Sequence, residues 1–324
     1  MNHLLRFVAA AIAVLSLALS GTAAIAQTYP TKPISLIVPF GPGSGTDLIT
    51  RIIAQRLGAV LGQSVIVENK AGANGTIAAM FVARAAPDGY TLFMSTNTPH
   101  SAAPFLMKSI NYDPAKDFVA LSRVGSFTQL LLVNPSIPAK SVQELIAHAK
   151  ANPGKLSFAS GNASSVLAGE TLKRWAGIDM LHVPYRSAPP AVQDVLGGRV
   201  SMLFTDMATG WPHHRSGTLR GLATTRLKRS ALVPELPTLD ESGVKDFDMD
   251  SWAGLFAPAG TPPAIIARLN TELRKIIDNP EVKAQIAATG FEAFSSTTAE
   301  LDEFVKAQLV KWQRMIKDAG IQPE

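Results

Sequence analysis

The feature of this chain that most limits its fold is a regular alternation of short apolar runs with amphipathic stretches. The apolar run 34–40 is followed by a glycine-rich turn and then by an amphipathic stretch over 47–61. The same order recurs with a run at 63–68, a stretch at 76–85 and a run at 90–95. Short apolar runs predict buried strands, and the amphipathic period predicts helices. Strands and helices in alternation are typical of parallel α/β sheets.

The second part of the chain continues this alternation before returning to helices. We predict further strands and helices, in chain order, at 118–124, 129–134, 141–151, 156–160, 162–176, 182–185, 190–196, 199–205, 221–225 and 252–257. Three helical stretches complete the chain after residue 262. We therefore predict an α/β fold with two lobes, in which the chain crosses twice and leaves a ligand cleft with a hinge. Residues 27–127 with 250–324 form the first lobe, and residues 128–249 form the second.

The N-terminus has the pattern of a secretory signal peptide over residues 1–26. Arg6 precedes an apolar stretch at 7–19, and small residues occupy the positions before a cleavage site after Ala26. The alternative is a transmembrane anchor, but the apolar stretch ends at 20–21, and a membrane span needs about 20 apolar residues. We predict an exported protein of a bacterial periplasm.

Composition excludes several classes of site. The chain has no cysteine, which excludes disulfides, thiolate metal sites and cysteine nucleophiles. Its net charge of +5 is not concentrated in any basic run, so we predict no nucleic-acid partner. The sequence has no Gly-x-Ser-x-Gly and no His-Glu-x-x-His motif, and the pair His213-His214 lacks a third ligand at useful spacing. We predict no cofactor, no metal and no catalytic residue.

The turn at 40–47 is the sharpest local candidate for a binding site. It reads Phe-Gly-Pro-Gly-Ser-Gly-Thr-Asp between a predicted strand and a predicted helix. Free amides and the positive end of a helix suit an anion there, and glycines allow close approach. No Lys follows as in a phosphate-binding loop, and Thr46 stands where a dinucleotide fingerprint has glycine. The alternative is a tight turn in which Thr46 or Asp47 only caps the helix. The candidate ligand-binding residues of this turn are Phe40, Gly43, Ser44 and Gly45.

Three other polar segments follow predicted strands. A second helix-start loop at 160–165 reads Ser-Gly-Asn-Ala-Ser-Ser, and its residues either cap the helix or bind a carboxylate. Two such loops in opposite lobes favour one shared anion site. The candidates from this loop, from the strand end at 95–100 and from the strand end at 205–206 are Thr96, Asn97, Ser160, Asn162, Ser164, Ser165, Thr205 and Asp206.

Some of these residues have structural alternatives. Asp206 is either a helix cap or a polar contact in the cleft. Arg186 pairs either with an anion or with a structural carboxylate. We expect His100 to be a structural or rim residue rather than a catalytic base.

Motifs along the whole mature chain resemble one known family, the substrate-binding proteins of tripartite tricarboxylate transporters, also called the Bordetella uptake gene family. The matching segments are Val38-Pro-Phe-Gly-Pro-Gly-Ser-Gly-Thr-Asp47, Val67-Glu-Asn-Lys-Ala-Gly-Ala-Asn-Gly75, Ala86-Pro-Asp-Gly-Tyr-Thr-Leu92, Leu167-Ala-Gly-Glu170, His182-Val-Pro-Tyr-Arg186, Leu196-Gly-Gly198 and Ala257-Pro-Ala-Gly-Thr-Pro262. The resemblance implies a type II-like periplasmic binding protein whose two lobes close on a small carboxylate. It also implies that the loops 40–47 and 160–165 hold the ligand through amides, hydroxyls and waters, with Asp206 at the cleft.

One departure from the family pattern concerns the second loop. Ser164-Ser-Val166 stands where the family commonly has a Gly/Ser-rich loop followed by His. The family binds many different carboxylates, so the resemblance does not identify the ligand of this chain.

The function predicted from these observations is that of a periplasmic solute-binding protein. We expect a monomer that captures a small carboxylate (a di- or tricarboxylate, an acidic amino acid or an aromatic acid) and delivers it to membrane permease subunits. One alternative is a ligand-sensing subunit of a signalling system that docks a receptor kinase. The other is a hydrolase or isomerase, for which the sequence offers no nucleophile–base pair.

Overall fold

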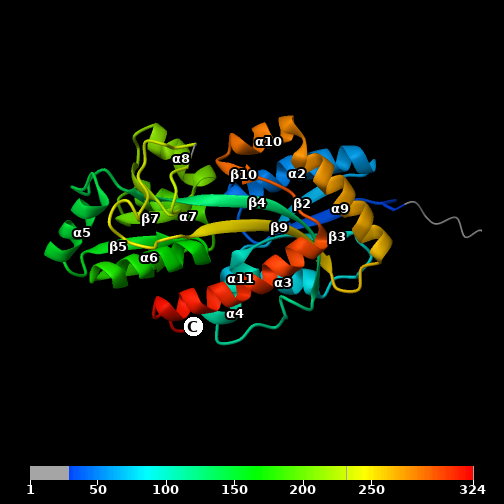
Figure 1. Cartoon of the computed structure of the whole chain (residues 1–324), viewed down its shortest axis with the longest axis horizontal. Coiled ribbons are helices and arrows are strands. Elements are labelled where there is room, and N and C mark those ends of the chain that lie inside the picture. Colours follow the sequence, from blue (N-terminus) through cyan, green and yellow to red (C-terminus); the bar gives the residue numbers. More distant parts are fainter. Residues whose placement is uncertain (1–28, 231, 324) are drawn as a thin grey trace, which may run out of the picture. The chain divides into compact units, whose positions relative to one another are not determined.

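In the part of the chain that the structure describes, ten strands form one sheet with helices on both faces (Figure 1). The computed structural model describes residues 29–230 and 232–323, so the predicted signal peptide lies outside the described residues. The strand order is β2-β1-β3-β9-β4-β7-β5-β6, with β8 and β10 also paired to β4. The strands are β1 (Ile34–Val38), β2 (Val65–Asn69), β3 (Thr91–Thr96), β4 (Phe118–Val133), β5 (Leu156–Ser160), β6 (Met180–Pro184), β7 (Met202–Asp206), β8 (Arg220–Thr224), β9 (Asp250–Pro258) and β10 (Phe291–Ala293).

The sheet has two parallel regions joined by antiparallel strands. Strand β1 runs parallel to β2 and β3, and β5 runs parallel to β6 and β7, as the alternation of elements predicts. Strand β4 pairs antiparallel with β9 up to Thr128 and with β7 from Gln129 onward. We call β1–β3, β9, β10 and residues 118–128 the first half, and β5–β8 with residues 129–133 the second half. The lobe boundaries stay a prediction, because the described chain from Lys32 onward is one compact unit.

Strand β4 differs from the sequence prediction, which has two separate apolar runs at 118–124 and 129–134. The structure has one strand of 16 residues with a bulge beside Gly125, where the register against β9 shifts. Gly125 has φ 143°, and a Cβ there would overlap the carbonyl oxygen of Glu292. Glycine therefore lets the strand bend without ending, which a break in the apolar pattern does not reveal.

The helices connect the strands and cover both faces of the sheet. They are α2 (Gly45–Leu61), α3 (Thr76–Ala83), α4 (Ala103–Leu106), α5 (Val142–Ala151), α6 (Ala163–Ala176), α7 (Ala188–Leu196), α8 (Met207–Arg215), α9 (Pro263–Asp278), α10 (Pro280–Ala287) and α11 (Thr298–Asp318), with short turns η1 (Ala73–Gly75) and η2 (Thr98–Ala102). In the first half, α2, α9 and α10 lie on one face, and α3, α4 and α11 lie on the other (Figure 1). Among the described residues, none of these helices has the length and apolar character needed to cross a membrane.

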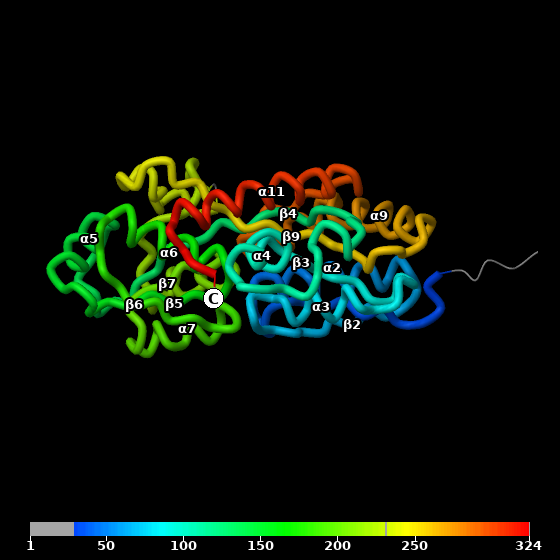
Figure 2. Tube along the Cα trace, turned by 90° about the horizontal axis from the view of Figure 1, so that it is seen from below, coloured from blue at the N-terminus to red at the C-terminus, as the bar shows by residue number. Residues whose placement is uncertain are grey.

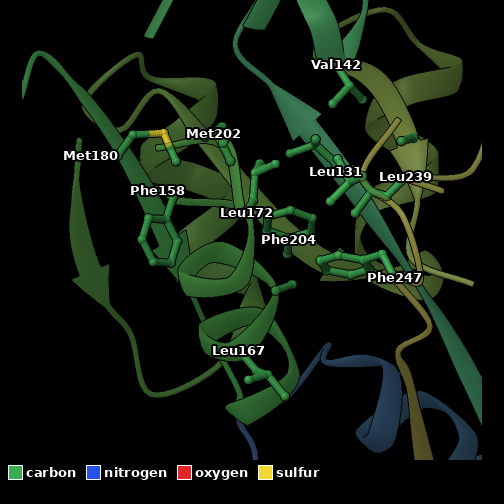
Figure 3. Close-up of a cluster of buried hydrophobic side chains, with 14 of the residues drawn as sticks. Leu131, Val142, Phe158, Leu167, Leu172, Met180, Met202, Phe204, Leu239 and Phe247 are labelled. Atoms are coloured by element: carbon green, nitrogen blue, oxygen red, sulfur yellow. The ribbon is translucent and has the colours of Figure 1, made fainter. Parts of the chain in front are cut away.

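Helix α11 contributes to the buried cores of both halves. Its residues Leu301 and Val305 belong to a first core with Phe93 and Trp252. Further along the same helix, Trp312 and Ile316 belong to a second core. Figure 3 shows other members of this second core, which include Leu131, Phe158, Leu172, Phe204 and Phe247. Figure 2 shows α11 running along the molecule beside β4, with which it is in contact. One amphipathic helix therefore ties the two halves together.

Candidate functional site

Strand ends and crossing strands from both halves surround a small cavity. In α/β sheets, ligands bind at the carboxyl ends of parallel strands, and the ends of β3 and β5 meet here. The residues that line the cavity are Phe40, Ser44, Thr46, Thr96, Asn97, Thr98, Phe127, Gln129, Gly161, Asn162, Ala188, Asp206 and Ser251. We refer to this space as the cavity.

The first loop presents the start of α2 to the cavity. Ser44 is the N-cap of α2, and its hydroxyl accepts a hydrogen bond from the Asp47 amide at 3.3 Å. This hydroxyl satisfies only one of the amides that lack an acceptor within a helix, so the amides of Gly45 and Thr46 lie at the open end. Gly43 is a turn residue with φ 78° and does not line the cavity.

Asp47 holds the first loop in place instead of facing the cavity. Its carboxylate accepts from the Gly43 amide at 3.0 Å, from Arg51 Nε at 3.0 Å and from Asn69 Nδ2 at 2.9 Å. Burial alone would raise the pKa of Asp47, but the hydrogen bonds from Arg51, Gly43 and Asn69 hold it below its usual value. Asn69 also donates to the Phe40 carbonyl at 2.9 Å. The turn geometry therefore depends on Asp47, while Phe40 and Ser44 reach the cavity.

Gly45 brings the two halves into contact. A Cβ at this position would overlap Asp206 Oδ1 and would lie 2.8 Å from the Phe127 ring. The start of α2 and the Asp206 carboxyl are therefore direct neighbours, and only glycine allows that approach.

Most polar groups of the second loop, residues 160–165, form hydrogen bonds within the loop itself. Asn162 is the N-cap of α6 and accepts from the Ser165 amide at 2.9 Å. The Ser165 hydroxyl accepts from the amides of Gly161 at 3.0 Å and Asn162 at 3.1 Å, and donates to the Asn162 carbonyl at 2.7 Å. Ser165 therefore organises the loop and is not among the residues that line the cavity. Asn162 does line it.

Polar side chains connect the two halves beside the cavity. Asn97 Nδ2 donates to Ser164 Oγ at 2.9 Å, and Ser164 Oγ lies 2.6 Å from Ser251 Oγ. Gln129 Nε2 donates to Ser251 Oγ at 3.0 Å. A second contact between the halves is the hydrogen bond from the Ala163 amide to Thr98 Oγ1 at 3.2 Å. These bonds run from the end of β3 through the start of α6 to the crossing strands β9 and β4.

Gln129 and Ser251 lie in the cavity wall but are not among the candidates predicted from the sequence. Gln129 is 0 % exposed, and its Oε1 is buried with no hydrogen-bond partner among the described residues. The one sequence signal that points to Gln129 is its position as a polar residue directly before the apolar run Leu130-Leu-Leu-Val133 of a buried strand. A buried polar atom without a partner is rare in a native protein and calls for an explanation.

Asp206 lines the cavity and is also the N-cap of α8. Its Oδ1 accepts from the Thr209 amide and from the Thr209 hydroxyl, both at 3.0 Å. Burial raises the pKa of the Asp206 carboxyl, because the charged form loses its water. Its neighbour Thr205 does not line the cavity, since its methyl group packs against Gly210 of α8.

The remaining candidates lie outside the cavity. Ser160 is hydrogen-bonded to His182 at 2.6 Å and lines a separate pocket. His100 is fully buried, where its Nδ1 bonds Ser95 Oγ at 2.6 Å, and burial lowers its pKa to about 3. Its ring stacks on Phe256 with 4.1 Å between the ring centroids, which is a structural placement.

Arg186 lies in an outer pocket that adjoins the cavity. This outer pocket shares Phe40, Gly161 and Asn162 with the cavity wall and also includes Tyr185. Within residues 29–230 and 232–323, no three His, Asp or Glu side chains are placed to hold a metal ion.

The structure thus brings part of the candidate set together. Phe40, Ser44, Thr96, Asn97, Asn162 and Asp206 line the cavity. Gly45 touches Asp206, and Ser164 bonds the lining residues Asn97 and Ser251. Gly43, Ser160, Ser165 and Thr205 do not line the cavity. That any of these residues binds a ligand stays a prediction.

Comparison with known proteins identifies the family of this chain. The model of the tripartite tricarboxylate transporter family receptor matches residues 49–321. Protein BugT of Bordetella pertussis is 37% identical over 298 residues, which cover 91% of each chain. R. palustris Rpa4515, solved with adipate, is 32% identical with a TM-score of 0.89, covering 91% of this chain and 100% of that one. Periplasmic binding protein BugD is 33% identical with a TM-score of 0.87 and the same coverage.

Proposed function

The chain belongs to the tripartite tricarboxylate transporter receptor family, and from that premise we propose that it captures a small carboxylate in the periplasm and delivers it to the membrane components of such a transporter. The family assigned from the sequence motifs is confirmed, as is the α/β periplasmic binding protein fold. One solved relative, BugD, is a periplasmic binding protein, and another, Rpa4515, was solved with adipate, a dicarboxylate.

The observation that carries the proposal is the start of α2 at the cavity wall. The amides of Gly45 and Thr46 and the hydroxyls of Ser44 and Thr46 are neutral donors beside the positive end of a 17-residue helix. Each such interaction contributes about 1 kcal/mol to holding an anion, and more where water is excluded. Several of them acting together can hold a carboxylate without a Lys or Arg.

Titration calorimetry with a panel of mono-, di- and tricarboxylates, amino acids and aromatic acids tests this proposal. We expect at least one carboxylate to bind and to raise the melting temperature, since ligand at 100 times Kd adds about 2.7 kcal/mol of stability. Thr46→Val should weaken that ligand about 5- to 30-fold, because it removes one hydroxyl from the cavity wall.

Thr50→Val is the matched control for this measurement. Thr50 is a buried residue one turn further along α2, where its hydroxyl donates to the Thr46 carbonyl and does not reach the cavity. We expect it to leave the affinity unchanged. A panel in which no carboxylate binds while neutral sugars do would contradict the proposal.

Delivery to a transporter needs a separate experiment. The purified protein loaded with its ligand should support uptake in vesicles that carry the membrane components, and the ligand should be recovered chemically unchanged. Recovery of a chemically converted product would show that the protein is a catalyst and not a transport protein.

A further inference from the structure

The cavity wall has one ionisable residue, and that residue is acidic. Among the lining residues, all of which the structure describes, Asp206 is the only Asp, Glu, Lys, Arg or His. Arg186 lies in the outer pocket and not in the cavity wall. A ligand that carries only negative charge would therefore meet a buried carboxyl with no cation beside it, which is unfavourable in a low-dielectric site.

Two hydrogen-bond acceptors lie side by side in this wall. Gln129 of β4 stands directly opposite Asp206 of β7 in the antiparallel register, so both side chains are on the same face of the sheet. Gln129 Nε2 is used by Ser251, which leaves the buried Oε1 without a partner. The Thr209 bonds to Asp206 both fall on Oδ1, and a carboxylate has further acceptor sites. This part of the cavity therefore offers acceptors to a donor group.

The donors of the protein lie immediately next to these acceptors. A Cβ on Gly45, at the start of α2, would overlap Asp206 Oδ1. A ligand that bonds both the donors at the start of α2 and the acceptors of Asp206 and Gln129 must therefore carry an anionic group and a donor group only a short distance apart. An ammonium group on the carbon next to a carboxylate has that spacing, and it also supplies the positive charge that the wall lacks.

We propose that the preferred ligand is an α-amino acid whose carboxylate binds at the start of α2 and whose ammonium group lies between Asp206 and Gln129 Oε1. This assignment rests on the proposed function and narrows the carboxylate to a class. Burial raises the pKa of the Asp206 carboxyl in the ligand-free protein, and a bound ammonium would remove the cost of its charge. A plain dicarboxylate would instead require Asp206 to bind a proton.

The test is titration calorimetry at pH 7.5 with two series of ligands. Within each series, the ligands differ only in the substituent on one carbon. The first series is succinate, malate and L-aspartate, and the second is glutarate, 2-hydroxyglutarate and L-glutamate. In the series that binds, we expect the amino acid to bind at least tenfold more tightly than the unsubstituted diacid, with the hydroxy acid between them.

Two variants separate this role from a structural one. Asp206→Asn keeps an oxygen to cap α8, because Asn and Asp are similar N-caps. It should weaken the amino acid at least tenfold and leave the diacid unchanged or tighter. Gln129→Met removes the acceptor at similar volume and should weaken only the amino acid and the hydroxy acid. Melting temperatures of the ligand-free variants report whether either change has damaged the fold.

The outcomes are distinguishable. If the diacid binds as tightly as the amino acid, or if the only carboxylates that bind lack an amino group, the amino-acid assignment is wrong while carboxylate binding stands. If no carboxylate binds, the proposed function itself fails.

Discussion

At the scale of single residues, Asp206 both caps a helix and lines the cavity. It is 6 % exposed, it caps α8, and burial raises its pKa above the ordinary value of 3.8. The native state therefore keeps this proton to a higher pH than the unfolded chain does. Between about pH 4 and the native pKa, the native state binds more protons, so the free energy of unfolding falls as pH rises through that window. Above the native pKa of Asp206, the free energy of unfolding stays lower by the amount lost across this window.

We therefore expect Asp206→Asn to stabilise the ligand-free protein at neutral pH. The free energy of unfolding should rise by about 1.4 kcal/mol for each pKa unit by which burial shifts Asp206. The gain should shrink as the pH falls and disappear well below pH 4, where the parent carboxyl is protonated in both states. Denaturant unfolding at several pH values measures this difference. Asp318→Asn, at a side chain that is 69% exposed, is the control and should show no such trend. Parallel pH profiles for the parent and Asp206→Asn would contradict the argument.

At the scale of elements, the start of α6 shows how a helix-start loop can consume its own donors. Ser165 Oγ accepts from two amides and donates to a carbonyl, all within the loop 161–165. Ser165→Ala should therefore lower the free energy of unfolding by about 1–3 kcal/mol, because it leaves one buried and one part-buried amide without an acceptor. Thermal unfolding followed by circular dichroism measures the change.

Ser187→Ala is the matched control for Ser165→Ala. Ser187 is also a buried serine at the start of a helix, but its side chain makes no capping hydrogen bond to α7. We expect a change within about 0.5 kcal/mol. Equal effects for the two serines would show that the capping box of α6 contributes little.

These loops also show where prediction from sequence ends. Most strands and helices follow from periodicity, and the turn at 40–47 follows from its glycines, because both signals are local. Whether the Ser165 hydroxyl faces a ligand or two amides depends on the path of the backbone, which composition does not contain. Gln129 is significant only because β4 pairs it with Asp206 of β7, some 77 positions away in the chain, and no local pattern carries that register.

At the scale of the whole molecule, three elements prevent the two halves from being independent. Strand β4 pairs with β9 in the first half and with β7 in the second. The polar contacts from Asn97 to Ser164 and Ser251 join the halves beside the cavity. Helix α11 places Leu301 in the first core and Trp312 in the second. Each of these would have to break for one half to unfold alone.

We therefore expect the ligand-free protein to unfold in a single thermal transition, with equal calorimetric and van't Hoff enthalpies. Trp312→Ala should lower the free energy of unfolding by about 3–5 kcal/mol, because Trp312 is 1 % exposed in the second core. The transition should nevertheless remain single. Because α11 packs in both cores, the lost packing energy should destabilise both halves together. Trp175→Ala is the control at a tryptophan that is 49 % exposed, where we expect less than about 1 kcal/mol. Two resolved transitions, of which Trp312→Ala shifts only one, would show that the halves fold separately and that α11 docks on the second core without coupling them.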